Sequence, residues 1–319
     1  MTHSSTPDDL VADSPASVVT SPSAPPPLPV FLSPRDLGAA IGVSESSVKR
    51  WADSGQLKLV RTRGGHRRIR LPEAIRFIQK QRHEVVRPEL LGLPSRARQL
   101  ARQPVHEIAR TLSRFLQEGK LAEAHAALLH AFVEGVELVT IARDILQPAL
   151  EQIGELWHHG PDGIAIEHAA TEALLQSLHE IARLLPASDG PVALGGAPEW
   201  DHYQLPSLLA SMALQQAGWR STNLGARVPV AALLAAAARL QPKLIWLSLS
   251  HDEPRGAARA YIEVAAAGLQ GSDALLAIGG RLSGDLKDAR LPLDPQRVLF
   301  VDSLAQLQDL ARSRSGPVK

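Results

Sequence analysis

Five short apolar runs in the C-terminal part of this chain alternate with longer stretches in which alanine and leucine recur at helical spacing. Such alternation favours right-handed strand–helix–strand crossovers, which place parallel strands in one sheet covered by helices on both faces. We expect strands at 192–195, 219–223, 243–248, 274–278 and 298–301, and helices at 207–217, 230–240, 255–268 and 303–312. The pattern therefore predicts an α/β, Rossmann-like parallel sheet over residues 190–315.

Ligands of such sheets bind beyond the carboxyl ends of the strands. The loops expected there carry one histidine, two serines and two glycines: His202, Ser248, Ser250, Gly279 and Gly280. The sequence contains no GxGxxG turn at the first helix and no P-loop, which disfavours a dinucleotide or a nucleoside triphosphate. A histidine on such a loop either holds a metal cofactor or is a loop residue without a binding role.

The chain of 319 residues has no cysteine. This excludes disulfides, cysteine-bound zinc, iron–sulfur clusters and thiol nucleophiles, so a metal must be held by His, Asp or Glu or arrive in a preformed cofactor. Aromatic residues make up only 4% of the chain, which favours helix-rich structure over a β-sandwich. No signal peptide or membrane-spanning run is evident, and we expect a cytoplasmic protein.

The N-terminal stretch has an unusual composition. Residues 1–30 contain seven prolines, three aspartates and neither lysine nor arginine. A segment of this kind buries too little apolar surface to offset chain entropy. We therefore predict a disordered tail over residues 1–29.

The next segment is strongly basic. Residues 31–82 hold twelve Lys or Arg against four Asp or Glu. Such an excess points to nucleic acid, bound through phosphate neutralisation, although a solvated basic face is the simpler alternative.

The order of elements in this segment favours DNA. Ser33 and Pro34 open a helix over 34–41, and Ser44 caps a second helix that stops near Gly55. We expect the second helix to present Ser46, Ser47, Lys49 and Arg50 to a major groove.

A hairpin with a basic tip follows the second helix. The runs 57–61 and 67–71 surround Gly64 and Gly65, and Pro72 opens a third helix. The hairpin would form a wing able to lie on the sugar-phosphate backbone through Arg61, Arg63, His66, Arg67 and Arg68.

The stretch LSPRDLGAAIGVSESSVKRWADSGQLKLVRTRGGHRRIR resembles the winged helix-turn-helix of MerR-type transcription regulators, a motif that excisionase-like proteins share. The resemblance implies a DNA-binding domain over residues 30–82. Residues 83–94, with Pro88 and Pro94, are expected to form a linker that lets the head and the rest of the chain orient separately.

Four helical apolar stripes lie in the middle segment, and they predict a four-helix bundle over residues 95–186. Between the last two stripes stands LWHHGPDGIAIEHAATEALL, which contains Trp157, His158, Glu167 and His168. On the simplest interpretation, Trp157 packs the end of the bundle and Glu167 lies favourably near a helix N-terminus.

The loops of the C-terminal segment together resemble the cobalamin-binding domain, and the middle segment resembles the helical cap of CarH-type adenosylcobalamin-dependent light-sensing repressors. The resemblance implies that His202 ligates cobalt from below and that Ser248 with Ser250 contacts the buried nucleotide tail. Gly279 and Gly280 would leave room for that tail. It further implies that Trp157, Glu167 and His168 surround the upper adenosyl group, and that His158 can bind cobalt once light has expelled that group.

Two positions of the histidine motif and one of the serine motif depart from the cobalamin pattern. Trp200 stands where an acid usually fixes the imidazole, and Leu205 stands where glycine allows close approach to the macrocycle. Asp201 or Glu199 could replace the acid if the loop bends, and Ser250 stands where leucine is usual.

Three hypotheses follow from the sequence. The first is a repressor, not an enzyme, that binds double-stranded operator DNA as a dimer or tetramer under the control of adenosylcobalamin and light, in a bacterial nucleoid. The second is a regulator of the same architecture that works without cobalamin or with another bulky ligand. The third is a corrinoid methyl-transfer protein, which a DNA-binding head and the lack of a catalytic module disfavour.

Overall fold

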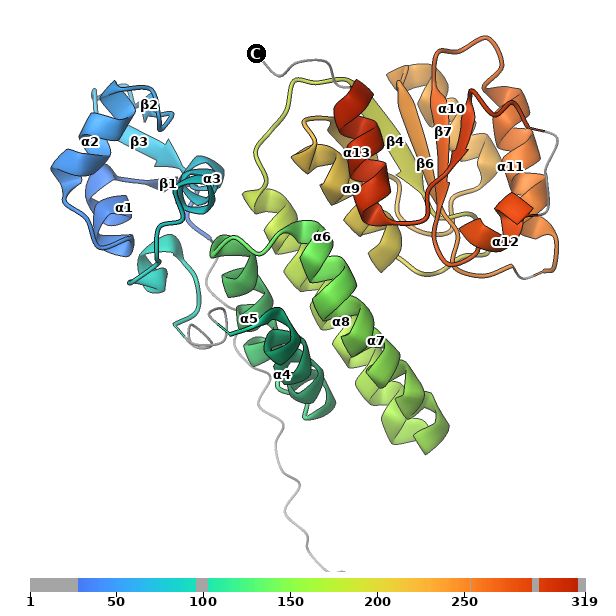
Figure 1. Ribbon diagram of the computed structural model, residues 1–319, viewed down its shortest axis with the longest axis horizontal. Coiled ribbons are helices and arrows are strands. Elements are labelled where there is room, and N and C mark those ends of the chain that lie inside the picture. Colours follow the sequence, from blue (N-terminus) through green and yellow to red (C-terminus); the bar gives the residue numbers. More distant parts are fainter. Residues whose placement is uncertain (1–27, 96–102, 253, 289–292, 315–319) are drawn as a thin grey trace, which may run out of the picture.

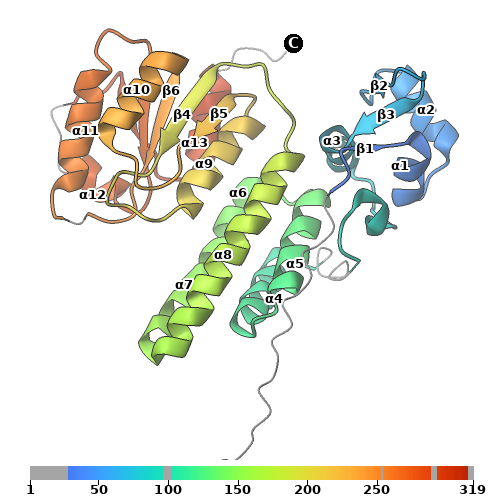
Figure 2. The ribbon, with the colours of Figure 1, turned by 180° about the vertical axis from the view of Figure 1, so that it is seen from behind.

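The computed structural model describes residues 28–95, 103–252, 254–288 and 293–314. Figures 1 and 2 show a small N-terminal region, a set of long helices in the middle and an α/β region at the C-terminal end. The tail expected over residues 1–29 lies outside the described residues except for its last two positions.

Short helices and strands build the N-terminal region: β1 (Phe31–Leu32), α1 (Pro34–Ala40), α2 (Glu45–Asp53), β2 (Val60–Arg61), β3 (Arg67–Arg70) and α3 (Leu71–Gln81). Ser33 and Asp36 form a reciprocal capping box at the start of α1, and Ser44 accepts a hydrogen bond from the N–H of Ser47 at the start of α2. The strands pair antiparallel in the order β1-β3-β2. The short β1, which sequence reasoning missed, pairs Leu32 with Ile69.

The segment expected to be a linker packs against α1 instead. Val85 and Leu91 are fully buried, and the N–H groups of Val86 and Arg87 both donate to the carbonyl of Ala40. A short 3₁₀ helix, η1 (Pro88–Leu91), forms within it. The expectation of a free linker over residues 83–94 is thereby corrected, because its apolar side chains complete the core of the N-terminal region.

The middle of the chain folds into helices at the positions of the four apolar stripes. They are α4 (Val105–Gln117), α5 (Leu121–Val133), a run of α6 (Leu138–Thr140), η3 (Ile141–Leu146) and α7 (Gln147–Gly154), and α8 (Pro161–Leu184). The η3 turn is a π-helix inside the third stripe, and the 3₁₀ helix η4 (Glu155–His159) follows α7. Leucine and isoleucine side chains of all four stripes share one buried core.

A five-stranded parallel sheet forms the C-terminal region. Its strands are β4 (Val192–Gly196), β5 (Arg220–Asn223), β6 (Leu244–Ser248), β7 (Leu275–Gly279) and β8 (Val298–Phe300), in the order β5-β4-β6-β7-β8. These bounds agree with the predicted strands to within one residue. The change of direction at β4, which pairs with both β5 and β6, creates a switch point beside the loop after β4.

Helices cover both faces of the sheet (Figure 1). Side chains of α9 (Leu205–Gln216) and α13 (Leu304–Arg314) share one core with the sheet, and those of α10 (Val230–Leu240) and α11 (Ala257–Gly268) share another. A short helix, α12 (Ser283–Asp288), was not expected from the sequence. The helical and sheet regions join where Leu205, Leu208 and Met212 of α9 enter the core of the helical region.

Hydrogen bonds link the N-terminal region to the helices; in one of them, Nε2 of His130 on α5 donates to the carbonyl of Pro94 at 2.6 Å. The side-chain amide of Gln79 on α3 donates to the carbonyl of Phe132 on α5 at 2.6 Å. Within the described part of the chain, no helix is long and apolar enough to cross a membrane.

Candidate functional site

Three loops meet at the carboxyl edge of the parallel sheet, and a buried acid joins two of them. Asp201, which is 0% exposed, accepts hydrogen bonds from the N–H of Tyr203 in its own loop at 2.9 Å and from the N–H of Ser250 in the loop after β6 at 2.6 Å. Arg281, in the loop after β7, donates from Nε to the carbonyl of Ser250 at 3.2 Å. The three predicted loops are therefore brought together.

The glycine pair lets the second and third loops come very close. Gly280 has φ +101°, and a Cβ there would lie 2.3 Å from the carbonyl oxygen of Leu249 and 2.6 Å from its nitrogen. The N–H of Leu249 donates to the carbonyl of Gly279 at 2.9 Å, and the N–H of Leu282 donates to the carbonyl of Leu249. The lack of a side chain at Gly280 thus makes room for the backbone of Leu249.

His202 lies on the outer side of its loop. Its side chain is exposed, and its ring stacks on Tyr203 at a centroid distance of 4.4 Å. A second histidine, His251, lies edge-on to His202 with centroids 5.3 Å apart. Sequence reasoning missed His251, although its position immediately after Ser248-Leu249-Ser250 places it on a predicted site loop.

The two residues of the histidine loop that depart from the cobalamin motif have structural partners. The indole N–H of Trp200 donates to the carbonyl of His251 at 3.0 Å, and its ring packs edge-on against Tyr261. Burial, and to a smaller extent the charge of Glu199, raises the pKa of Tyr261, so its hydroxyl stays protonated and donates to the carbonyl of Val228. Leu205 is the first residue of α9 and is buried in the core of the helical region.

These loops fit the cobalt of a cobalamin better than its nucleotide tail. The exposed His202 imidazole has no hydrogen-bond partner among the described residues, so its nitrogens are available as metal donors. Ser248 and Ser250 are only 5% and 7% exposed, and the space beside Gly280 is occupied by Leu249. A nucleotide tail can therefore reach these serines only if the loops separate.

The predicted cap residues lie at the far end of the helical region. His158 and His168 are exposed, and the carboxylate of Glu167 contacts His168 Nδ1 at 2.7 Å and accepts from the Thr171 hydroxyl at 2.9 Å. The side chain of Trp157 lies outside the described part of the structure. In Figure 1 the N-terminal end of α8 stands clear of the sheet, so this structure does not bring the cap residues to the three loops.

The basic residues predicted to bind DNA divide into exposed and internally paired groups. Arg50, Arg61, Arg63 and His66 are exposed. Arg67, by contrast, forms an ion pair with Asp53 of α2 at 2.9 Å, which ties the hairpin to that helix. Ser46 and Ser47 hydrogen-bond Ser44, Lys49 pairs with Glu45, and Arg68 is half-buried, so these four side chains are partly engaged within the region.

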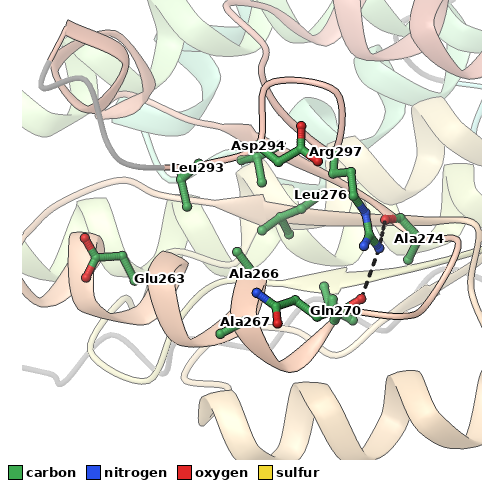
Figure 3. Close-up of a pocket in the computed structure, with 11 residues that line it drawn as sticks. Glu263, Ala266, Ala267, Gln270, Ala274, Leu276, Leu293, Asp294 and Arg297 are labelled. Atoms are coloured by element: carbon green, nitrogen blue, oxygen red, sulfur yellow. Dashed lines mark hydrogen bonds between the residues drawn. The ribbon is translucent and has the colours of Figure 1, made fainter.

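A cavity of about 380 Å³ lies between α11, β7 and the start of β8 (Figure 3). Arg297 points into it but donates to the backbone carbonyls of Leu269 and Ser272. Its lining residues Ala274 and Val298 stand at the amino-terminal ends of β7 and β8, on the opposite edge of the sheet from His202. This cavity is therefore separate from the three loops.

Comparison with protein families assigns a cofactor class to the helical region. Residues 108–181 match the family described as the B12 binding domain. The match spans most of α4 to α8, and it confirms the expectation of cobalamin as the cofactor.

Two comparisons cover most of the chain. It is 25% identical over 229 residues to the HTH-type transcriptional repressor CarA of Myxococcus xanthus, covering 67% of this chain and 75% of that protein. It also resembles the solved structure of the Methanosarcina barkeri monomethylamine corrinoid protein, with a TM-score of 0.54 and 15% identity, over 66% of this chain and 99% of that one. The second likeness shows that the helical region and parallel sheet share the fold of that protein. The expected resemblance to cobalamin-binding transcription regulators is confirmed.

Proposed function

We propose that this chain is a transcriptional repressor whose binding to double-stranded DNA is controlled by cobalamin. The proposal rests chiefly on one combination: a basic N-terminal region precedes a B12 binding domain in a chain similar to a repressor over two thirds of its length. Neither a corrinoid carrier for methyl transfer nor a simple DNA-binding protein accounts for both parts.

In this proposal the N-terminal region is a winged helix-turn-helix. The helix α2 enters the major groove with Ser46, Ser47, Lys49 and Arg50, and the hairpin lies on the phosphates. Arg61, Arg63 and His66 make direct contacts because they are exposed, while Arg67 sets the position of the wing through its ion pair with Asp53. Arg68 completes the basic surface.

The cofactor is held between a four-helix cap and the sheet. Imidazole from the loops at the carboxyl edge would hold the cobalt. The cap residues Trp157, His158, Glu167 and His168 would hold the upper ligand once the N-terminal end of α8 has moved toward those loops. When bound, adenosylcobalamin supplies a cobalt–carbon bond that light can cleave. His158 is exposed, and the contact between Glu167 and His168 holds those two side chains against each other.

Oligomerisation of the chain links cofactor binding to DNA binding. A region of this size makes few base contacts, so useful affinity requires two or more heads on one duplex. We propose a dimer or tetramer that forms with adenosylcobalamin in the dark and dissociates in light, in the cytoplasm at the nucleoid. The heads are oriented by the helical region, because Gln79 joins α3 to α5.

The test uses the full chain purified in the dark with adenosylcobalamin. A shift of the visible spectrum reports ligand exchange at cobalt, and sizing before and after illumination reports assembly. Selection from a random duplex library, with and without adenosylcobalamin, reports DNA binding. The proposal expects a spectral shift, a light-sensitive oligomer and enrichment of a repeated half-site. Absence of binding at micromolar adenosylcobalamin would refute cobalamin control.

Two observations favour a second candidate, a repressor of the same architecture that acts without cobalamin. The serine and glycine loops are closed on each other, and Trp200 replaces the usual acid. This candidate predicts the same enriched half-site with no dependence on adenosylcobalamin or light.

A further inference from the structure

The acid in the histidine loop lies against a different histidine from the one that the cobalamin motif designates. A cobalt-ligating imidazole is normally fixed by a carboxylate that accepts its other ring N–H. Asp201 directly precedes His202, yet no hydrogen bond or ion pair between them is found in the described structure. Oδ1 of Asp201 instead lies 3.9 Å from Nδ1 of His251.

The ring of His251 is partly buried beside the carboxylate of Asp201. Its Nδ1 is buried and has no hydrogen-bond partner in the described part of the chain, while 26% of its side chain is exposed. Since Nδ1 is buried against Asp201, Nε2 is the nitrogen available to an external metal. A shift of about 1 Å would bring Nδ1 within hydrogen-bond distance of the carboxylate and fix the tautomer with Nε2 unprotonated.

Two hydrogen bonds hold the backbone at and next to His251. Its carbonyl accepts from the Trp200 indole at 3.0 Å, and the preceding residue, Ser250, donates its N–H to Asp201. Trp200, which replaces the motif acid, therefore positions the second histidine. A single change would account for two observations, that Trp200 stands at the motif position of the acid and that Asp201 faces His251. In that change the cobalt ligand has moved from the loop after β4 to the loop after β6.

We infer that His251, whose ring faces Asp201 and whose carbonyl is hydrogen-bonded by Trp200, is the lower axial ligand of the cobalt in this chain, in place of His202. The inference rests on the proposed cobalamin binding. His202, exposed and stacked on Tyr203, then flanks the ligand without binding the metal. Asp201 is a positioning residue, since it acts through His251.

The experiment uses the full chain with cob(II)inamide, a corrinoid that carries no nucleotide base. Any axial nitrogen seen by electron paramagnetic resonance then comes from the protein, and ¹⁵N-histidine labelling assigns it to imidazole. Wild type, His202→Ala, His251→Ala, Asp201→Asn and the control His179→Ala, an exposed histidine of α8, are compared by this spectrum and by cobinamide titration.

We expect the nitrogen splitting in wild type, His202→Ala and His179→Ala, and its loss in His251→Ala. Asp201→Asn should keep the splitting but weaken cobinamide binding about 10-fold or more, as losses of a carboxylate behind a ligating histidine usually do. If His251→Ala does not fold, His251→Gln removes the imidazole while keeping a polar side chain of similar size.

Loss of the splitting in His202→Ala, or its persistence in both His251 variants, would overturn this assignment and leave cobalamin binding intact. A wild-type chain that binds neither cobinamide nor adenosylcobalamin would instead refute the proposed function, and this inference with it.

Discussion

The carboxylate of Asp201 accepts a hydrogen bond from the backbone N–H of Ser250 at 2.6 Å, although 48 residues of chain lie between them. Asp201 is fully buried and also accepts from the N–H of Tyr203. One side chain thus sets the relative positions of the loops after β4 and β6.

Removal of the Asp201 carboxylate should destabilise the sheet region. Asp201→Ala leaves two backbone donors without their acceptor, at a cost of about 1–3 kcal/mol for each buried group. We expect a loss of about 2–4 kcal/mol in the free energy of unfolding by urea, and a smaller loss for Asp201→Asn, which keeps one acceptor oxygen. Asp309→Ala, on the exposed side of α13, should change stability by less than about 1 kcal/mol. Equal effects of Asp201→Ala and Asp309→Ala would contradict this role.

Gly280→Ala should be far more damaging than the same change at another glycine with positive φ. The new Cβ at Gly280 would meet the Leu249 backbone at 2.3 Å, whereas at Gly271, with φ +82°, nothing lies within 4 Å. Gly271→Ala therefore costs only the backbone strain of about 1 kcal/mol, and Gly280→Ala should cost about 3 kcal/mol or more. Thermal and urea unfolding of the two variants measure the difference. Similar midpoints would show that the loops are not closed on each other in solution.

Arg63→Ala should weaken DNA binding through the loss of a phosphate contact. Arg63 is exposed at the tip of the hairpin, so its removal should reduce the slope of log K against log salt by about 1. Arg67→Ala, which loses the ion pair with Asp53, should lower affinity through wing position, with a smaller change of slope. Arg239→Ala, an exposed arginine of α10, is the control. Titrations of the selected duplex at several salt concentrations measure these slopes. Equal slopes for Arg63→Ala and Arg239→Ala would contradict a phosphate contact by Arg63.

Gln79→Ala should loosen the contact between α3 and α5. The lost hydrogen bond to the Phe132 carbonyl contributes about 1 kcal/mol, and hydrogen exchange in α3 should become faster. Gln81→Ala removes an exposed glutamine on the same helix and should leave exchange unchanged. Indistinguishable exchange in the two variants would show that this hydrogen bond does not hold the N-terminal region on the helices.

Most helices and strands could be predicted from the sequence because local periodicity determines them. The four residues at 244–247 are apolar and buried within the sheet, and β6 (Leu244–Ser248) forms within one residue of the predicted strand at 243–248. The caps at Ser33 and Ser44 mark the starts of α1 and α2 because a side-chain oxygen there satisfies a free backbone N–H. The short β1 and α12 escaped prediction, since two to six residues carry too little pattern.

The sequence by itself determined the order of elements, the basic surface and the loops on which His202, Ser248 and Gly280 lie, because these follow from neighbours in the chain. Only the tertiary structure decided which groups those residues meet. It placed Asp201 against His251, buried Leu205 in the helical core, packed residues 85–93 on α1 and engaged Arg67 with Asp53. Each of these contacts joins segments that are distant along the chain or turns a side chain inward. Their partners are therefore set by the packing of whole regions, which local periodicity does not encode.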